Sequence, residues 1–167
     1  MTIMMPASDQ AVLARRDAIV AALRAIVPGE GVIDSPAEML PYESDGLMAY
    51  RQPPMVVVLP DTTEQVSKVL KYCFEQGIKV VPRGSGTSLS GGALPLADGV
   101  LLGLGKFKRI REIDFDNRVV VTEPGVTISP SARRWRMPDF ITRPTRRRRS
   151  PARLAAMSRK IPAACTV

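Results

Sequence analysis

A glycine-rich segment in the middle of the chain has the residue types that bind a phosphate group. Glycines let the main chain approach an anion closely and turn several backbone N–H groups toward it. Hydroxyl groups can donate further hydrogen bonds, and the arginine could face a phosphate or support the loop by a salt bridge. The segment reads Pro82, Arg83, Gly84, Ser85, Gly86, Thr87, Ser88, Leu89, Ser90, Gly91, Gly92.

The same pattern alone fits a flexible polar turn equally well. It is not a P-loop, because no Gly-Lys-Ser/Thr follows the glycines. It is not a Rossmann fingerprint either, because no helix is expected directly after it to present its N-terminus to the phosphate. The residues therefore indicate an anion-binding loop without deciding between these two interpretations.

Little else in the sequence points to catalysis or metal binding. The chain has no histidine, and Cys73 and Cys165 are too few and too far apart for a disulfide framework or a zinc site. We interpret Cys73 as a core residue. No catalytic residue is assigned, since the nearest candidates are interpreted as surface and loop-packing groups: Tyr42, Glu43, Asp45 and Tyr50.

A β-α-β unit is expected to position the loop. Residues 55–59 and 78–81 are short apolar runs typical of strands, and Thr62 with Gln65 predicts a capping box for the helix between them. A crossover of this length makes the two strands parallel, so the loop follows the C-terminal end of a strand. Gly77 should end the helix, and one buried face is expected to hold Val66, Val69, Leu70, Cys73 and Phe74.

The flanking segments complete an expected α+β fold. Residues 9–27 have the spacing of one amphipathic helix, and residues 35–40 predict a short capped turn that ends before Pro41. Two further strands are expected at residues 100–104 and 118–122, the second closed by the turn Glu123, Pro124, Gly125.

Four ordered motifs resemble the FAD-linked oxidase family, and within it the FAD-binding subunit of glycolate oxidase and D-lactate dehydrogenase. They are Val58-Leu59-Pro60, Thr63-Glu64-Gln65-Val66, the run from Val80 to Gly92, and the run from Val121 to Val126. The resemblance implies the N-terminal part of a PCMH-type FAD-binding domain, whose loop holds the FAD diphosphate through backbone amides. The cofactor-binding residues it implies are Pro82, Arg83, Gly84, Ser85, Gly86, Thr87, Ser88, Gly91, Gly92, Pro124 and Gly125.

The resemblance also implies a flavin-dependent 2-hydroxy-acid oxidoreductase. Family members pass hydride from the hydroxy acid to FAD, and the electrons then go to an acceptor or to other glycolate oxidase subunits. We expect this chain to be a truncated and inactive piece that lacks the substrate domain and does not bind FAD tightly. No membrane span is expected, and the location implied is cytoplasmic, with the parent enzyme peripheral to the inner membrane through its partner subunits.

The last 40 residues differ in composition from the rest. Residues 1–127 carry 13 Lys and Arg against 15 Asp and Glu, whereas residues 128–167 carry 11 against Asp139 alone and contain no glycine. Such a segment is expected to be a disordered basic tail. A small basic protein that binds nucleic acid or an acidic surface is the alternative function, although no nucleic acid is expected as a partner.

A frameshift would explain this tail. With suitable wobble bases, the neighbouring frame over residues 155–167 reads Gly-Gly-Asn-Val-Ala-Glu-Asn-Ser-Gly-Gly-Val-His-Cys, which resembles the family's second cofactor motif. We therefore expect a helical and loop segment at residues 1–53, a partial FAD-binding domain at 54–127, and an out-of-frame tail at 128–167. The coding DNA tests this hypothesis directly.

Overall fold

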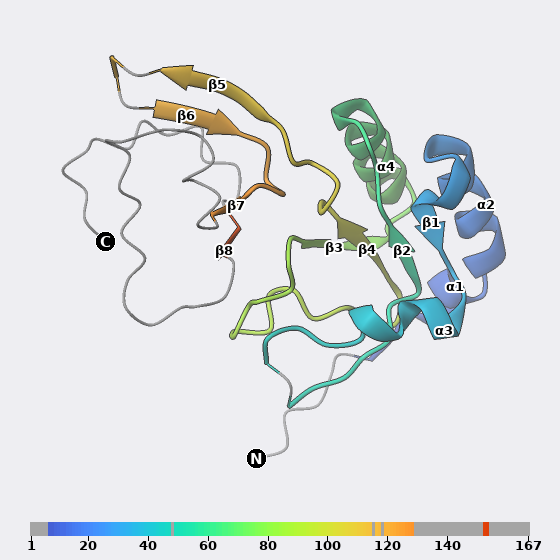
Figure 1. The fold of residues 1–167 in the computed structure, drawn as a ribbon. Helices are drawn as coiled ribbons and strands as arrows, with labels where there is room; N and C mark the ends of the chain where they lie inside the picture. The colour runs from blue at the N-terminus through green and yellow to red at the C-terminus, as the bar shows by residue number, and fades with distance from the viewer. Residues whose placement is uncertain (1–6, 48, 115, 118, 129–151, 154–167) are drawn as a thin grey trace. The chain divides into compact units, whose positions relative to one another are not determined.

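A computed structural model describes residues 7–47, 49–114, 116–117, 119–128 and 152–153, which belong to two compact units, Met1–Lys106 and Phe107–Val167 (Figure 1). The first unit alternates helices and strands around one sheet. Its elements are α1 (Gln10–Leu13), α2 (Arg16–Ile26), a 3-10 turn (Gly29–Gly31), β1 (Val32–Ile33), α3 (Pro36–Met39), a second 3-10 turn (Leu40–Tyr42), β2 (Val56–Val58), α4 (Thr63–Glu75), β3 (Lys79–Arg83) and β4 (Gly99–Gly103).

The sheet of the first unit confirms the expected parallel β-α-β crossover. Its strand order is β1-β2-β4-β3, in which β2, β4 and β3 run parallel and β1 pairs antiparallel with β2. Leu101 of β4 lies in register with Val57 on one side and Val81 on the other. The sequence predicted that β2 and β3 are parallel but not that β4 would lie between them.

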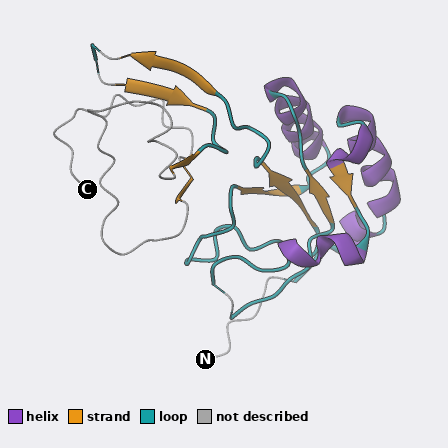
Figure 2. Ribbon diagram, in the orientation of Figure 1, coloured by secondary structure: helices purple, strands orange, loops and turns teal. Residues whose placement is uncertain are grey.

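The sheet is covered on both faces, which explains its apolar strands. Val56 and Val58 of β2 pack with α1, α2 and α4 on one face, and Figure 2 shows these helices together on one side of the strands. Val57 and Leu101 point to the opposite face, where they pack with Met39 of α3. Parallel strands buried on both faces require continuous apolar runs rather than alternation.

Helix α4 begins and ends as the sequence predicted. The Thr62 hydroxyl accepts a hydrogen bond from the Gln65 N–H at 3.2 Å, and the Gln65 side chain accepts one from the Thr62 N–H at 3.3 Å. Gly77 follows with a positive φ of 67°, which suits a residue without a Cβ. Cys73 is fully buried, which raises the pKa of its thiol to about 11 and confirms it as a core residue.

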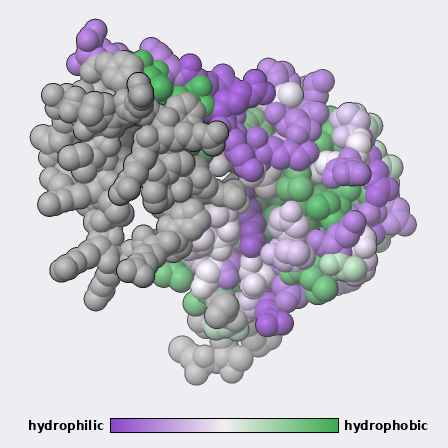
Figure 3. Space-filling view, in the orientation of Figure 1, coloured by the Kyte–Doolittle hydropathy of each residue, from purple (hydrophilic) through white to green (hydrophobic). Residues whose placement is uncertain are grey.

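The predicted buried face of α4 was too wide. Val69 and Cys73 are buried, but Leu70 is 45% exposed and Phe74 is 87% exposed. Each helical residue turns the side chain by about 100°, so Phe74 points roughly 120° away from the direction that Val69 and Cys73 share. Figure 3 shows hydrophobic residues interspersed with hydrophilic ones on the visible face of this unit.

The N-terminal region also differs from the sequence prediction. The single helix expected at residues 9–27 is divided into α1 and α2 where the Arg15 N–H bonds the Val12 carbonyl at 3.0 Å. The Arg15 guanidinium donates hydrogen bonds to the side chain and to the carbonyl of Gln76, which follows α4. These contacts stabilise the interruption between α1 and α2. Ser35 precedes α3 without the expected side-chain capping bond. Helix α3 begins at Pro36 and ends before Pro41 as expected, and Pro41 lies inside the 3-10 turn that follows.

The buried carboxylate of Asp98 fastens the start of α1 to the sheet. Asp98 is 3% exposed and accepts hydrogen bonds from the Asp9 N–H at 2.8 Å and from Lys79 Nζ at 2.7 Å. Burial by itself raises the pKa of Asp98, but the Lys79 bond and the backbone bonds outweigh it and leave the pKa below its ordinary value of 3.8. The charged carboxylate is therefore the form that stabilises the fold.

We expect Asp98→Asn to lower the free energy of unfolding at pH 7 by about 1 to 3 kcal/mol, as for hydrogen bonds to charged groups. A group with a lowered folded-state pKa contributes stability above its unfolded pKa and loses it as the pH falls through the folded value. The difference between wild type and variant, measured by urea unfolding, should therefore vanish in strong acid. The control Asp61→Asn removes a surface pair with Lys106 and should cost less than about 1 kcal/mol. Equal effects of the two substitutions would contradict the role of Asp98.

The second unit contains a two-stranded antiparallel sheet. Strands β5 (Ile110–Asp114) and β6 (Val119–Thr122) form a hairpin, of which the sequence predicted only β6. A shorter pair joins β7 (Thr127–Ile128) to β8 (Ala152–Arg153). Apart from Ile128 and β8, the tail at residues 128–167 lies outside the described residues. In the part of the chain that the structure describes, no helix is long and apolar enough to cross a bilayer.

Candidate functional site

The glycine-rich loop leaves the sheet directly at the end of β3. This strand extends through Arg83, two residues further than expected, and the Leu104 N–H bonds the Arg83 carbonyl at 2.9 Å. The loop proper therefore begins at Gly84. Its position at the C-terminal end of a parallel strand is the one the sequence predicted, and it is a common location for ligand sites in such sheets.

The loop carries a run of free backbone donors. The N–H groups from Gly84 to Leu89 make no hydrogen bond to any described residue, whereas those of Ser90 and Gly92 both bond the Ser88 hydroxyl oxygen at 3.3 Å. A group of neighbouring N–H donors without protein acceptors is suited to an anion. No acidic residue occurs between Pro82 and Leu96, so no carboxylate of the loop competes for these donors.

Glycine is required in this loop at two positions. Gly86 and Gly91 have φ angles of 69° and 73°, whereas Gly84 and Gly92 do not adopt a positive φ. A side chain at Gly86 would collide with the Arg83 guanidinium, whose Nε would lie 2.6 Å from the added Cβ. Gly91 has open space around it. Gly86 therefore meets both a conformational and a packing requirement.

Arg83 supports the loop from below rather than facing outward. Arg83 is only 9% exposed, and its Nη1 donates a hydrogen bond to the Tyr42 carbonyl at 3.0 Å. The guanidinium carbon lies 5.8 Å from the centre of the Tyr42 ring. Burial lowers the pKa of Arg83, and the charge of Asp45 acts in the opposite direction, followed by Tyr42. An arginine remains charged despite such a shift. Of the two roles left open by the sequence, the geometry favours support, although without a direct salt bridge among the described residues.

The hydroxyl groups of the loop have different roles. Ser88 acts as an internal acceptor that closes the turn around Ser90 and Gly92. The hydroxyls of Ser85 and Thr87 lie 3.3 Å apart and make no other hydrogen bond to the described protein. They can therefore add donors beside the free N–H groups, whereas Ser88 mainly shapes the loop.

Two residues interpreted from the sequence as surface or loop-packing groups lie in this site. Tyr42 supplies the carbonyl and the ring that hold Arg83. Asp45 is 5% exposed, so it is a buried group and not a surface one. The sequence carried no local signal for either role, because both residues are about 40 positions away from the loop.

The turn at Pro124 and Gly125 belongs to the second unit. Its Gly125 N–H bonds the Phe107 carbonyl at 2.7 Å. The preceding Glu123 is buried and accepts hydrogen bonds from the Arg109 N–H at 2.9 Å and from Arg111 at 3.2 Å. The backbone bond from Arg109 is the main reason that the pKa of Glu123 lies below its ordinary value. Glu123 thus holds the base of the hairpin, and the cofactor role expected for Pro124 and Gly125 stays a prediction.

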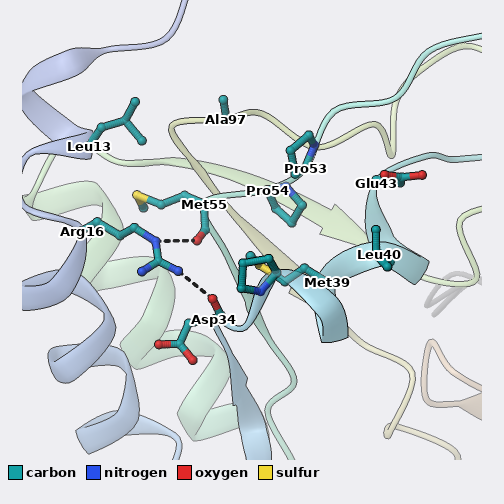
Figure 4. A pocket seen from close by; sticks show the side chains of 11 residues that line it. Leu13, Arg16, Asp34, Met39, Leu40, Glu43, Pro53, Pro54, Met55 and Ala97 are labelled. Atoms are coloured by element: carbon teal, nitrogen blue, oxygen red, sulfur yellow. Dashed lines mark hydrogen bonds between the residues drawn. The ribbon is translucent and has the colours of Figure 1, made fainter.

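A separate cavity of about 590 Å³ suits a phosphate less well, because the carboxylates of Asp34 and Glu43 lie at its wall (Figure 4). Arg16 lies at its wall, but its guanidinium already donates to the carbonyls of Met55 at 3.3 Å and Asp34 at 2.7 Å. Most of the other lining residues are apolar, such as Met39, Leu40 and Pro54. Within the described residues, no group of three or more histidine, cysteine or acidic side chains could hold a metal ion. The loop is therefore the candidate site.

Comparison with known proteins shows which family this chain, with its loop, resembles. The family model described as FAD binding domain matches residues 54–137, which is half of the chain. The glycolate oxidase subunit GlcD of Escherichia coli (strain K12) is 48% identical over 111 residues, covering 66% of this chain and 22% of that protein. The D-lactate dehydrogenase of Archaeoglobus fulgidus is 47% identical over 73 residues, covering 44% of this chain and 16% of that protein.

The fold is also found among solved structures. p-Cresol methylhydroxylase with bound substrate is similar with a TM-score of 0.61 and 27% identity, covering 75% of this chain and 25% of that chain. The 4-ethylphenol oxidase of Gulosibacter chungangensis has the same TM-score at 24% identity and shares the fold. This chain spans about a fifth of the length of the curated relatives it matches.

Proposed function

Because this chain belongs to the FAD binding domain family, whose cofactor is FAD, we propose that its loop from Arg83 to Gly92 binds the FAD diphosphate. The observation that carries the proposal is the run of N–H groups from Gly84 to Leu89, which have no hydrogen-bond acceptor in the described part of the chain. A diphosphate has several oxygen acceptors and negative charge, which match neighbouring backbone donors that no carboxylate occupies.

The residues of the loop divide into donors and supports in this proposal. Gly84, Ser85, Gly86, Thr87 and Ser88 present backbone N–H groups, and the hydroxyls of Ser85 and Thr87 are free to add to them. Pro82 and Arg83 support the loop from the strand, and the Ser88 hydroxyl fixes the amides of Ser90 and Gly92. The loop needs no metal ion in this role. Pro124 and Gly125 are proposed to contribute a further backbone contact to the cofactor.

We propose that this chain is part of a larger enzyme, called the parent enzyme here, which is a 2-hydroxy-acid oxidoreductase of the glycolate oxidase or D-lactate dehydrogenase type. The names of the E. coli and A. fulgidus relatives support this substrate class, and the word subunit in the first supports partner chains. FAD, when bound, accepts a hydride from the substrate. We assign no residue of this chain to the proton transfer, and we expect no hydroxy-acid turnover by the 167-residue chain alone. The parent enzyme is proposed to be cytoplasmic and to contact the inner membrane through its partners.

The test is a titration of the uniformly ¹⁵N-labelled chain with FAD, followed by ¹H–¹⁵N NMR. We expect the amide signals of Gly84 to Leu89 to shift progressively and to saturate, since those N–H groups meet the diphosphate. The complex should be too weak to retain flavin through gel filtration, because the loop contacts only the diphosphate. ADP should shift the same signals, and riboflavin, which has no phosphate, should not. Unchanged loop amides at saturating FAD would contradict the proposal.

A further inference from the structure

A buried carboxylate without a full set of partners lies beside the loop. Asp45 follows the 3-10 turn Leu40–Tyr42, and one of its oxygens, Oδ1, accepts a hydrogen bond from the Leu47 N–H at 2.8 Å. The other oxygen, Oδ2, is buried and has no hydrogen-bond partner among the described residues. Burying a charged oxygen is costly unless another charge or donor compensates it. Asp45 therefore needs a compensating group nearby.

The turn that contains Asp45 touches the loop backbone directly. A Cβ added to Gly46 would lie 2.7 Å from the Ser88 carbonyl oxygen and 3.0 Å from the Thr87 carbonyl group. The main chain at Gly46 is thus packed against the main chain of the loop with no room for a side chain. The main chain of the Asp45 turn thus contacts Thr87 and Ser88 without an intervening side chain.

Arg83 is a buried cation that can compensate the charge of Asp45, although no direct ion pair joins the two side chains among the described residues. Both residues are buried; burial lowers the pKa of Arg83, and the negative charge of Asp45 partly offsets this lowering. Arg83 in turn packs beneath Gly86, the loop residue with a φ of 69°. Asp45 therefore acts on Arg83 through its charge, and Arg83 in turn contacts the loop at Gly86.

We propose that Asp45 is a positioning residue for the diphosphate loop, holding Arg83 beneath Gly86 and the Asp45 turn against Thr87 and Ser88. This inference rests on the proposed function of the loop. As a consequence, the diphosphate is held mainly by backbone N–H groups, because the positive charge of Arg83 is compensated by the Asp45 carboxylate. Without the Asp45 carboxylate, Arg83 becomes an uncompensated buried cation that moves toward water and withdraws its support from Gly86.

The substitution Asp45→Asn distinguishes a positioning role of Asp45 from a simple effect of its charge on FAD binding. Asparagine keeps an oxygen for the Leu47 N–H, so the local turn is retained. Loss of a negative charge close to an anion site should by Coulomb attraction alone tighten FAD binding. A positioning role predicts the opposite sign, with FAD binding weaker by about tenfold or more in the NMR titration. The matched control Glu43→Gln removes the same charge two residues away, where the carboxylate pairs with exposed Arg51 at 3.3 Å, and should leave the affinity within about twofold.

A double variant tests whether Asp45 acts through Arg83, and it remains informative if Asp45→Asn alone fails to fold. Comparing Arg83→Gln with Asp45→Asn/Arg83→Gln, we expect the same FAD affinity, since Asp45 has no Arg83 charge left to hold. Tighter binding by Asp45→Asn, or a further large loss in the double variant, would overturn the inference. A wild-type chain whose loop amides do not respond to FAD would instead overturn the proposed function. The two failures are therefore distinguishable.

Discussion

Gly86→Ala is expected to weaken the binding of FAD to the loop strongly while leaving the sheet folded. Alanine at a φ of 69° costs about 1 kcal/mol in backbone strain. The new methyl group also collides with the Arg83 guanidinium, so that Arg83 or the loop must move. Because the free N–H groups lie on both sides of Gly86, either movement separates donors that have to meet one diphosphate. We expect FAD affinity to fall by more than about tenfold, equivalent to about 1.4 kcal/mol, in the NMR titration.

The control for this prediction is Gly77→Ala. Gly77 has a similar φ of 67°, but it lies after α4 and an added Cβ there meets no atom within 4 Å. The substitution introduces the same backbone strain without touching the loop. We expect a comparable loss in the free energy of unfolding and unchanged FAD binding. If both variants weakened FAD binding equally, general destabilisation and not the contact with Arg83 would be responsible.

The sequence predicted several parts of the fold that depend on local signals, although the cap expected at Ser35 forms no side-chain hydrogen bond. The capping box at Thr62 and Gln65, the stop at Gly77 and the parallel crossover each depend on residues a few positions apart, and the structure confirms all three. The position of the loop after β3 followed from the same reasoning. These features depend on backbone geometry that neighbouring residues decide, so one sequence is sufficient to predict them.

The parts that the sequence did not predict depend on contacts between distant segments. The insertion of β4 between β2 and β3 is decided by packing on both faces of the sheet, which periodicity does not reveal. The exposure of Phe74 depends on where α4 touches the sheet, not on its spacing. The roles of Asp45 and Tyr42 beneath the loop arise because the fold brings segments about 40 residues apart into contact. Asp45 was interpreted as a surface or loop-packing group because the sequence does not reveal these distant contacts.

Leu101→Ala is expected to have the largest effect on the stability of the first unit. Leu101 is fully buried in β4, between β2 and β3, and packs with Met39 and Val57 in a cluster that Tyr42 also contacts. Removing a buried leucine side chain leaves a cavity and costs about 2 to 5 kcal/mol. Urea unfolding followed by far-ultraviolet circular dichroism should show this loss as a lower midpoint with an unchanged slope.

We also expect Leu101→Ala to weaken FAD binding by the loop, through its effect on Tyr42. Loosening the packing around Tyr42 weakens the hold of its carbonyl on Arg83, so the variant should also bind FAD more weakly under conditions where it is still folded. The matched control is Leu40→Ala, which makes the same chemical change on the same side of the sheet at a side chain that is 61% exposed. It should change the free energy of unfolding by less than about 0.5 kcal/mol. A folded Leu101→Ala chain with wild-type FAD affinity would show that the loop is independent of this cluster, and that Arg83 is held without the support of the core beneath Tyr42.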